Sequence, residues 1–316
     1  SSAARAMRSN RSGLIGLITG AISFSHQAPE VSGLPEIFIV QGIQRALEAS
    51  GMTLLISDTG GRTERVAGLM RTFSEHRVEG IVYVADHHRK VTLPPVAPGM
   101  PIVLANCYDD EATPCVLPND RQGQYALVRD LIAHGHERIA YLTLSRGMDA
   151  TRLRTQGYLD ALAEAGIAHD PALVIPADLP SADPDAEVQL LWDALDRVLA
   201  LDPAPTVICC GNDRMAMRAY GMLRSRGLSI PRDISIAGYD NYRLVAETLY
   251  PRLTTVDLPY AAMGVHAAGM LLSLIRDEGP PPSEPLRVSG PVCWRDSVAR
   301  RTKPLSQITS IGRTTP

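Results

Sequence analysis

The sequence contains little of what marks a secreted or membrane-bound protein. Only five of its 316 residues are cysteines, the number is odd, no Cys-x-x-Cys pair occurs, and Cys209 and Cys210 lie inside an apolar run. Reduced, buried thiols explain this pattern better than a disulfide framework, and they favour the cytoplasm. No stretch approaches the roughly 20 apolar residues of a membrane span, so no contact with a membrane is expected. The amino-terminal residues also lack the apolar core of a signal peptide.

Enzyme signatures are missing as well. The chain has no Gly-x-Ser-x-Gly nucleophile turn, no Walker-type phosphate loop and no His-Glu-x-x-His metal helix. The stretch "GLIGLITG" (13–20) lacks the glycine spacing of a dinucleotide fold. His87-His88 and His134/His136 do not have the spacing of metal ligands, and we interpret them as loop and helix-end residues. The sequence therefore predicts neither catalysis nor a bound metal or cofactor.

Lysine is nearly absent, and arginine carries almost all of the positive charge. The net charge of −3 gives no reason to expect a nucleic-acid surface over the body of the chain. Residues 1–12 differ, because they combine helix-forming Ala and Met with Arg5, Arg8 and Arg11. This segment is either a basic, frayed terminus or a short helix that lies against nucleic acid.

Short apolar runs alternate with amphipathic segments from residue 14 onward. The runs predict strands at 14–19, 52–57, 80–85, 101–106, 138–144, 206–210 and 234–239, with a last one around 287–294. Several of the helices between them end at a glycine, as at Gly51, Gly135 and Gly166. Uninterrupted apolar strands that alternate with helices predict parallel sheets covered on both faces. Because the length suffices for two cores, we predict an α/β fold of two doubly wound parallel-sheet lobes.

Polar side chains follow two of the predicted strands where each strand ends. Asn212 comes after "TVICC", and Asp240 comes after "ISIAGY". In parallel sheets, ligands bind at the carboxyl ends of strands, near the starts of helices. Helix capping is the competing interpretation for Asn212, and turn formation is the competing one for Asp240. Arg152 and Arg154, at another strand-to-helix passage, are either solvated charges or a fork for a polar ligand.

Longer stretches of this sequence resemble the LacI/GalR family of bacterial transcription regulators. The stretch "GNDRMAMRAYGMLRSRGLSIPRDISIAGYDN" followed by "YPRLTTVDLPYAAMG" carries the resemblance, together with "LIAHGHERIAYL" and "RLRTQGYLDALAEAG", in the order of the family. The resemblance covers roughly residues 3–297 by this strand-helix pattern. It implies a type I periplasmic-binding-protein fold, in which three crossovers join two lobes and an effector binds between them.

The resemblance also implies boundaries along this chain. They are a hinge helix at 1–12, a first lobe of 13–134 plus 259–287, a second lobe of 135–258 plus 288–297, and a tail at 298–316. The sequence loses its periodicity from about residue 298, which indicates a surface extension or disorder in that tail.

The effector-contacting residues of the family fall on Arg154, Asn212 and Asp240, which the strand ends indicate independently. Asp213 is then expected to support the start of its helix rather than to touch the ligand. Further candidates for the lining of the cleft are Thr19, Phe24, Asp58, Asn119, Asp120, Arg152 and Tyr260. The resemblance also implies that the hinge contacts DNA through Arg5, Met7 and Arg8.

The chain departs from the family pattern around the expected cleft. The helix-turn-helix headpiece is missing, and the stretch 21–38 is longer than usual and lacks the common Asn-Pro-Phe-Phe. Residues 118–120 read "PND" where Asp-Asn is common, and no aromatic residue occurs in 175–185, where some members stack a sugar or a base. These departures prevent the transfer of any particular effector from the family to this chain.

We therefore expect the effector-sensing, dimerising core of a LacI-type regulator. A small polar effector, such as a sugar or a sugar derivative, would control the binding of operator DNA through a headpiece that this sequence lacks. The alternative is a periplasmic sugar-binding protein of a transporter, which has the same fold. The sequence encoded upstream distinguishes them: a helix-turn-helix supports the regulator, and a secretion signal supports transport.

Overall fold

The computed structural model describes residues 12–20, 22, 37–95, 98–179 and 183–301. The expected hinge residues Arg5, Met7 and Arg8, the cleft candidate Phe24 and most of the expected tail lie outside these ranges.

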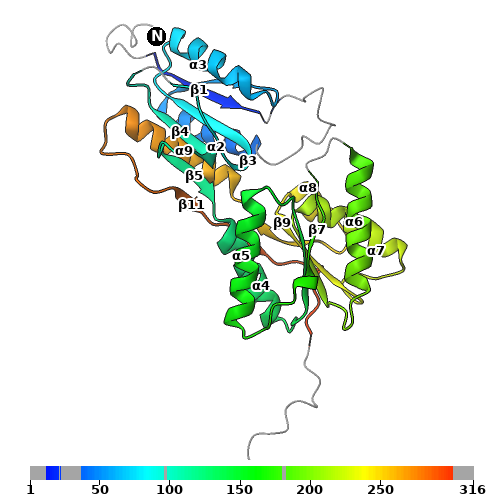
Figure 1. The fold of residues 1–316 in the computed structure, drawn as a ribbon. Helices are drawn as coiled ribbons and strands as arrows, with labels where there is room; N and C mark the ends of the chain where they lie inside the picture. The colour runs from blue at the N-terminus through cyan, green and yellow to red at the C-terminus, as the bar shows by residue number, and fades with distance from the viewer. Residues whose placement is uncertain (1–11, 21, 23–36, 96–97, 180–182, 302–316) are drawn as a thin grey trace, which may run out of the picture.

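Two six-stranded sheets form the core of the two lobes (Figure 1). The first sheet has the order β11-β5-β4-β3-β1-β2, and all of its strand pairs are parallel. Its strands are β1 (Leu14–Thr19), β2 (Thr53–Asp58), β3 (Ile81–Lys90), β4 (Ile102–Tyr108), β5 (Cys115–Pro118) and β11 (Leu286–Val288).

The second sheet repeats this arrangement, with the order β12-β10-β9-β8-β6-β7. Only β12 runs antiparallel, against β10. Its strands are β6 (Ile139–Thr143), β7 (Val174–Pro176), β8 (Val207–Cys210), β9 (Ser235–Asp240), β10 (Thr254–Asp257) and β12 (Val292–Cys293). The predicted α/β class with two parallel-dominated sheets is confirmed.

Helices cover both sheets. They are α2 (Ile37–Ser50), α3 (Val66–Glu75), α4 (Asp120–Ala133), α5 (Asp149–Glu164), α6 (Pro184–Leu199), α7 (Asp213–Ser225), the four-residue α8 (Arg243–Ala246) and α9 (Tyr260–Ile275), with short 3₁₀ turns at Thr63–Arg65 and Pro171–Leu173. Glycine follows three of them as expected. Gly51 after α2, Gly135 after α4 and Gly166 after α5 have φ of +71°, +89° and +67°, a conformation that glycine adopts without a steric penalty.

The chain passes between the two sheets three times. The passages lie between β5 and α4, between β10 and α9, and between β11 and β12. The expected first boundary, at residue 134, is wrong, because α4 packs against α5 and β10 of the second lobe. In the first two passages the chain crosses to the other lobe before it forms a helix. Helix α4 therefore packs in the second lobe and α9 packs in the first.

The stretch expected to form one last strand also differs. Residues 286–288 pair with β5 in the first sheet, whereas residues 292–293 pair with β10 in the second. Gly290 sits between the two strands, and a Cβ placed there would lie 2.0 Å from the carbonyl oxygen of Asp257. The third passage therefore needs a glycine at this close approach to β10.

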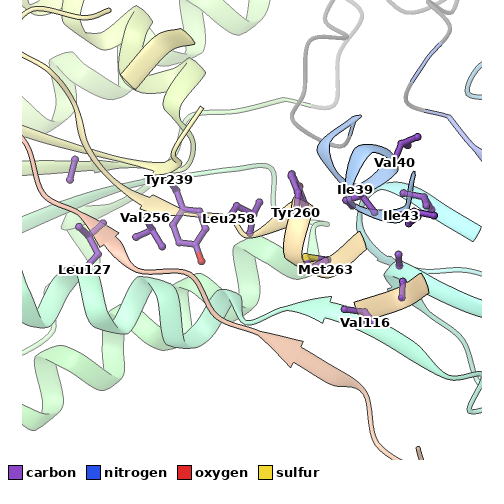
Figure 2. Close-up of a cluster of buried hydrophobic side chains, with 14 of the residues drawn as sticks. Ile39, Val40, Ile43, Val116, Leu127, Tyr239, Val256, Leu258, Tyr260 and Met263 are labelled. Atoms are coloured by element: carbon purple, nitrogen blue, oxygen red, sulfur yellow. The ribbon is translucent and has the colours of Figure 1, made fainter. Parts of the chain in front are cut away.

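One of three clusters of buried apolar side chains in the described residues runs through both lobes. On one side lie Ile39 and Ile43 of α2 in the first lobe, and on the other lie Leu127 of α4 and Val256 of β10 in the second (Figure 2). Tyr260 at the start of α9 lies between the two sets (Figure 2). The junction of the lobes is thus a packed apolar core on one face of both sheets.

Candidate functional site

Arg154 is the central group of the candidate site. Its side chain is 4% exposed on α5, and its Nε donates to Asp120 Oδ1 at 2.7 Å. Its Nη1 donates to the carbonyl oxygen of Gly211 at 2.7 Å, and its guanidinium carbon lies 3.6 Å from the centre of the Tyr239 ring. Burial lowers the pKa of Arg154 and the Asp120 charge raises it, with a net rise, so the guanidinium stays charged. A fixed, buried cation therefore lies at the carboxyl end of the second sheet.

Asp120, at the start of α4, neutralises this cation and also contacts the first lobe. Its Oδ2 lies 2.8 Å from Nδ1 of His88, a residue of β3. Burial raises the pKa of Asp120, but the Arg154 charge and the His88 hydrogen bond outweigh it, so the pKa lies below its usual value. The carboxylate is therefore ionised and held from both lobes.

Asp240 ends β9 in a conformation that is rare for an aspartate, with φ of +118°. Burial raises the pKa of this carboxyl well above its usual value; the Arg154 charge opposes the rise and the Asp213 charge adds to it. A strained backbone next to a carboxyl with a perturbed pKa is a combination typical of binding sites.

Asp213 connects the start of α7 to its neighbours. Its Oδ1 accepts from Thr255 Oγ1 at 2.6 Å, and its Oδ2 accepts from the backbone N–H of Tyr242 at 2.7 Å. Burial raises the pKa of Asp213 to about 7. The expectation that Asp213 has a supporting role agrees with these contacts.

Asn212 caps α7, since its Oδ1 accepts from the backbone N–H of Met215 at 2.8 Å. The capping interpretation of this residue is therefore confirmed. A cap and a ligand contact are compatible, because the oxygen makes the capping bond and the amide also carries an –NH₂ group.

The other cleft candidates fall into two groups. Thr19 is buried at the end of β1, and Asp58 at the end of β2 accepts from the backbone N–H groups of Ile22 and Gly60. The remaining candidates lie at the passages or on the surface. Asn119 donates to Ser289 Oγ, Tyr260 begins α9, and Arg152 is exposed and paired with Asp149.

Two hollows that are lined by residues the structure describes lie where the lobes meet. One, of about 420 Å³, is lined by Phe38 and Tyr260 from the first lobe and by Asp240 and Tyr242 from the second. The other hollow, of about 690 Å³, has His87 from the first lobe in its lining. Its second-lobe lining consists of Ser145, Arg146, Gly147, Met148, Pro176, Asp178, Leu179, Leu190 and Arg197. A hollow of about 820 Å³ in the first lobe has none of the buried charged groups described above in its lining, so we do not consider it the site.

The structure brings together some predicted residues and adds others. Arg154, Asp120 and Asp240 form one electrostatic group, whereas Arg152 is not part of it. Sequence reasoning missed His88, and it interpreted His87-His88 as loop residues although both belong to β3. The available signal was their place directly after an apolar strand, where the carboxyl edge of a parallel sheet lies.

Two kinds of feature do not occur in the part of the chain that the structure describes. In those residues, no helix is both long and apolar enough to cross a bilayer. The same residues contain no group of three or more His, Cys, Asp or Glu side chains arranged to hold a metal ion.

Comparison with known proteins places the chain among bacterial regulators. Residues 128–298 match the family model of the periplasmic binding protein-like domain. The HTH-type transcriptional repressor PurR of Vibrio atlanticus is 30% identical over 243 residues, which are 76% of this chain and 70% of the relative. The sucrose operon repressor of Escherichia coli is 36% identical over 199 residues, or 63% of this chain and 59% of the relative.

Solved structures agree. A putative LacI-family regulator from Rhizobium etli matches with a TM-score of 0.80 and 34% identity, over 92% of this chain and all of that one. The regulator CelR in complex with cellobiose matches with a TM-score of 0.73 and 27% identity, over 93% of this chain and 89% of that one.

Proposed function

The chain belongs to the LacI/GalR family of transcription regulators as an effector-binding core, and from this premise we propose that it senses a sugar or a sugar derivative between its lobes. The effector controls the binding of operator DNA by a headpiece attached to a homodimer of this core. The protein acts in the cytoplasm and does not transform its effector. The repressor relatives support this function over that of a periplasmic binding protein for a transporter.

The group formed by the buried Arg154 and Asp120, with the partly buried Asp240 beside them, is the observation that carries the proposal. A buried charge is costly unless a partner compensates it, so such a group persists where recognition uses it. Arg154 uses two of its five N–H donors on Asp120 and Gly211, and the proposal assigns others to effector oxygens. Asp240 accepts effector hydroxyls. A ligand rich in hydroxyl groups can accept from the N–H groups of Arg154 and donate to the oxygens of Asp240.

Regulation follows from the position of the site between two sheets. An effector that touches both lobes stabilises one arrangement of the lobes and thereby shifts the population of the core. The spacing of the two hinge segments in the dimer then changes, and with it the affinity for operator DNA. A coupling of about 1–3 kcal/mol is typical for such linkage.

Exposed apolar side chains support the dimer. Leu244 of α8 is 70% exposed and Tyr250 is 83% exposed, while Met217 of α7 and Ile56 of the edge strand β2 are 42% and 45% exposed. Side chains of this size on the surface of both lobes are what an interface between copies would cover. Tyr250→Glu is expected to shift the protein towards monomers in sedimentation equilibrium, and an unchanged assembly would count against this interface.

The effector site is tested by screening sugars and nucleosides for thermal stabilisation and then titrating the compounds that stabilise the protein. Asp240→Ala and Asn212→Ala should weaken binding of such a compound by about tenfold or more, because each removes one polar contact of about 1.5 kcal/mol. Asp193→Ala is the matched control, since Asp193 lies exposed on α6 and bonds only to Gln189 in the described structure. Unchanged affinity in both site variants would overturn the proposed site. Conversion of the compound during incubation would contradict the absence of catalysis.

A further inference from the structure

Strand β3 has a large bulge near its carboxyl end, where it contacts the second lobe. Val84 pairs with Ala105 of β4 and Arg89 pairs with Cys107, so four residues of β3 (85–88) stand opposite the single residue Asn106. Asn106 has φ of +61°, and its Nδ2 donates to the carbonyl oxygen of Ala85 at 3.2 Å. A bulge bends a strand and re-aims its side chains. Here it directs two histidines out of the regular strand register.

The two histidines reach the second lobe at different points. His87 lines the 690 Å³ hollow together with Ser145 and Asp178. His88 is 6% exposed, and its Nδ1 lies 2.8 Å from Oδ2 of Asp120. The bulge thus provides a buried hydrogen bond between the lobes that an unbulged strand would not provide.

The contact continues to the effector arginine. Asp120 uses Oδ2 for His88 and Oδ1 for Nε of Arg154, so one carboxylate joins β3 of the first lobe to α5 of the second. A fully buried carboxylate oxygen that loses its partner is costly. If the lobes separate and His88 withdraws, Asp120 has to reorient, and Arg154 has to follow.

We propose that His88 is a positioning residue through which the first lobe holds Arg154 in its orientation towards the effector. This inference rests on the proposed function, because it explains how lobe arrangement and effector affinity depend on each other. Another hydrogen bond between the lobes, from Tyr108 Oη to Asp149 Oδ2 at 3.0 Å, does not touch Asp120. It therefore offers a matched control for loosening the lobes without breaking the relay from His88 through Asp120 to Arg154.

The test observes Arg154 directly in the full chain. In deuterated protein with ¹⁵N-labelled arginine, the Nε–H resonance of Arg154 is assigned by its loss in Arg154→Lys. His88→Phe keeps a ring but no nitrogen, and His88→Leu removes the ring as well. His88→Asn keeps an N–H donor near the position of Nδ1. Circular dichroism and thermal unfolding establish which variants fold.

We expect exchange of the Arg154 Nε–H with water to be about tenfold faster in His88→Phe and His88→Leu, because local opening controls such exchange. In His88→Asn and in Tyr108→Phe it should stay within about twofold of the wild type. If His88 only stabilised the fold, its variants would have a lower melting temperature, but exchange of the Arg154 Nε–H would not be accelerated more than that of other buried groups.

Two results would overturn the relay. One is an unchanged exchange rate of the Arg154 Nε–H in His88→Phe and His88→Leu. The other is an equally faster exchange in Tyr108→Phe. Failure of the proposed function has a different signature, since no compound of the screen would then stabilise the wild-type protein, whatever the exchange of Arg154 shows.

Discussion

The two lobes have the same strand order, yet their carboxyl edges are built differently. In the second lobe, α7 connects β8 to β9, and its start provides Asn212 and Asp213. In the first lobe, the matching connection from β3 to β4 contains no helix in its described residues, and β3 instead extends into the bulge with His87 and His88.

The difference assigns separate roles to the lobes. The second lobe holds the buried charges, whereas the candidate carboxylate of the first, Asp58, is only partly buried and binds backbone N–H groups. The first lobe reaches the charged group through one histidine. The buried charges are thus concentrated in the second lobe, and the first lobe contacts them through the hydrogen bond between His88 and Asp120.

Each lobe also contains a pair of helices that pack closely at a glycine. In the first lobe α2 packs on α9, and in the second α5 packs on α4. A Cβ at Gly264 would lie 2.1 Å from the carbonyl oxygen of Ile39, and one at Gly157 would lie 2.1 Å from that of Arg121. In both pairs the two helices approach each other at a glycine, so this part of the scaffold is common to the two lobes.

The largest effect is expected from removing the buried cation of the second lobe. Arg154→Met should lower the free energy of unfolding by about 3–5 kcal/mol, because it leaves Asp120 without its charged partner. Asp58→Asn is the control in the first lobe, and it should cost only about 1 kcal/mol, because Asp58 is partly buried and the amide oxygen keeps one of the two bonds to backbone N–H groups. Urea denaturation followed by circular dichroism measures both. Similar losses in the two variants would contradict the assigned difference between the edges.

The next effect tests the shared helix packing. Gly157→Ala and Gly264→Ala should each cost about 1–3 kcal/mol of unfolding free energy, because the added methyl group forces two helix backbones apart. Gly221→Ala of α7 has open space around its Cβ and should instead stabilise by up to about 1 kcal/mol. A clear loss in one lobe only would show that the two helix pairs are not equivalent.

A pH-dependent effect concerns Asp213, which lies at a helix start that the described connection from β3 to β4 in the first lobe does not have. Its pKa is about 7 in the folded protein against 3.8 for the ordinary group, so between these values only the folded state keeps the proton. Unfolding then releases a proton, and the contribution of Asp213 to stability falls as the pH rises from about 4 to about 7. The slope is at most about 1.4 kcal/mol per pH unit.

Asp213→Asn removes this titration. The difference in unfolding free energy between wild type and variant should therefore change steadily from pH 5 to pH 7 and level off above. Urea titrations at four pH values provide the measurement. Parallel curves for the two proteins would mean that the Asp213 carboxyl titrates alike in the folded and unfolded states.

Much of the fold could be predicted because its signals are local. Long apolar runs such as 14–19 and 234–239 identified central strands, and glycine identified the ends of α4 and α5. The short strands β5 and β7 were missed, since runs of four and three residues carry too little periodicity. The first passage between the lobes was misplaced because nothing local in α4 indicates which sheet it covers.

The residues of the candidate site could likewise be predicted only in part. By itself, the sequence determined which polar residues follow the strands, because strand and helix periodicity arise within a few residues of the chain. Only the tertiary structure decided that Asp120 pairs with Arg154 and His88, residues 34 and 32 positions away. Those pairings depend on where α4 packs and on the bulge in β3, and both result from contacts between distant segments.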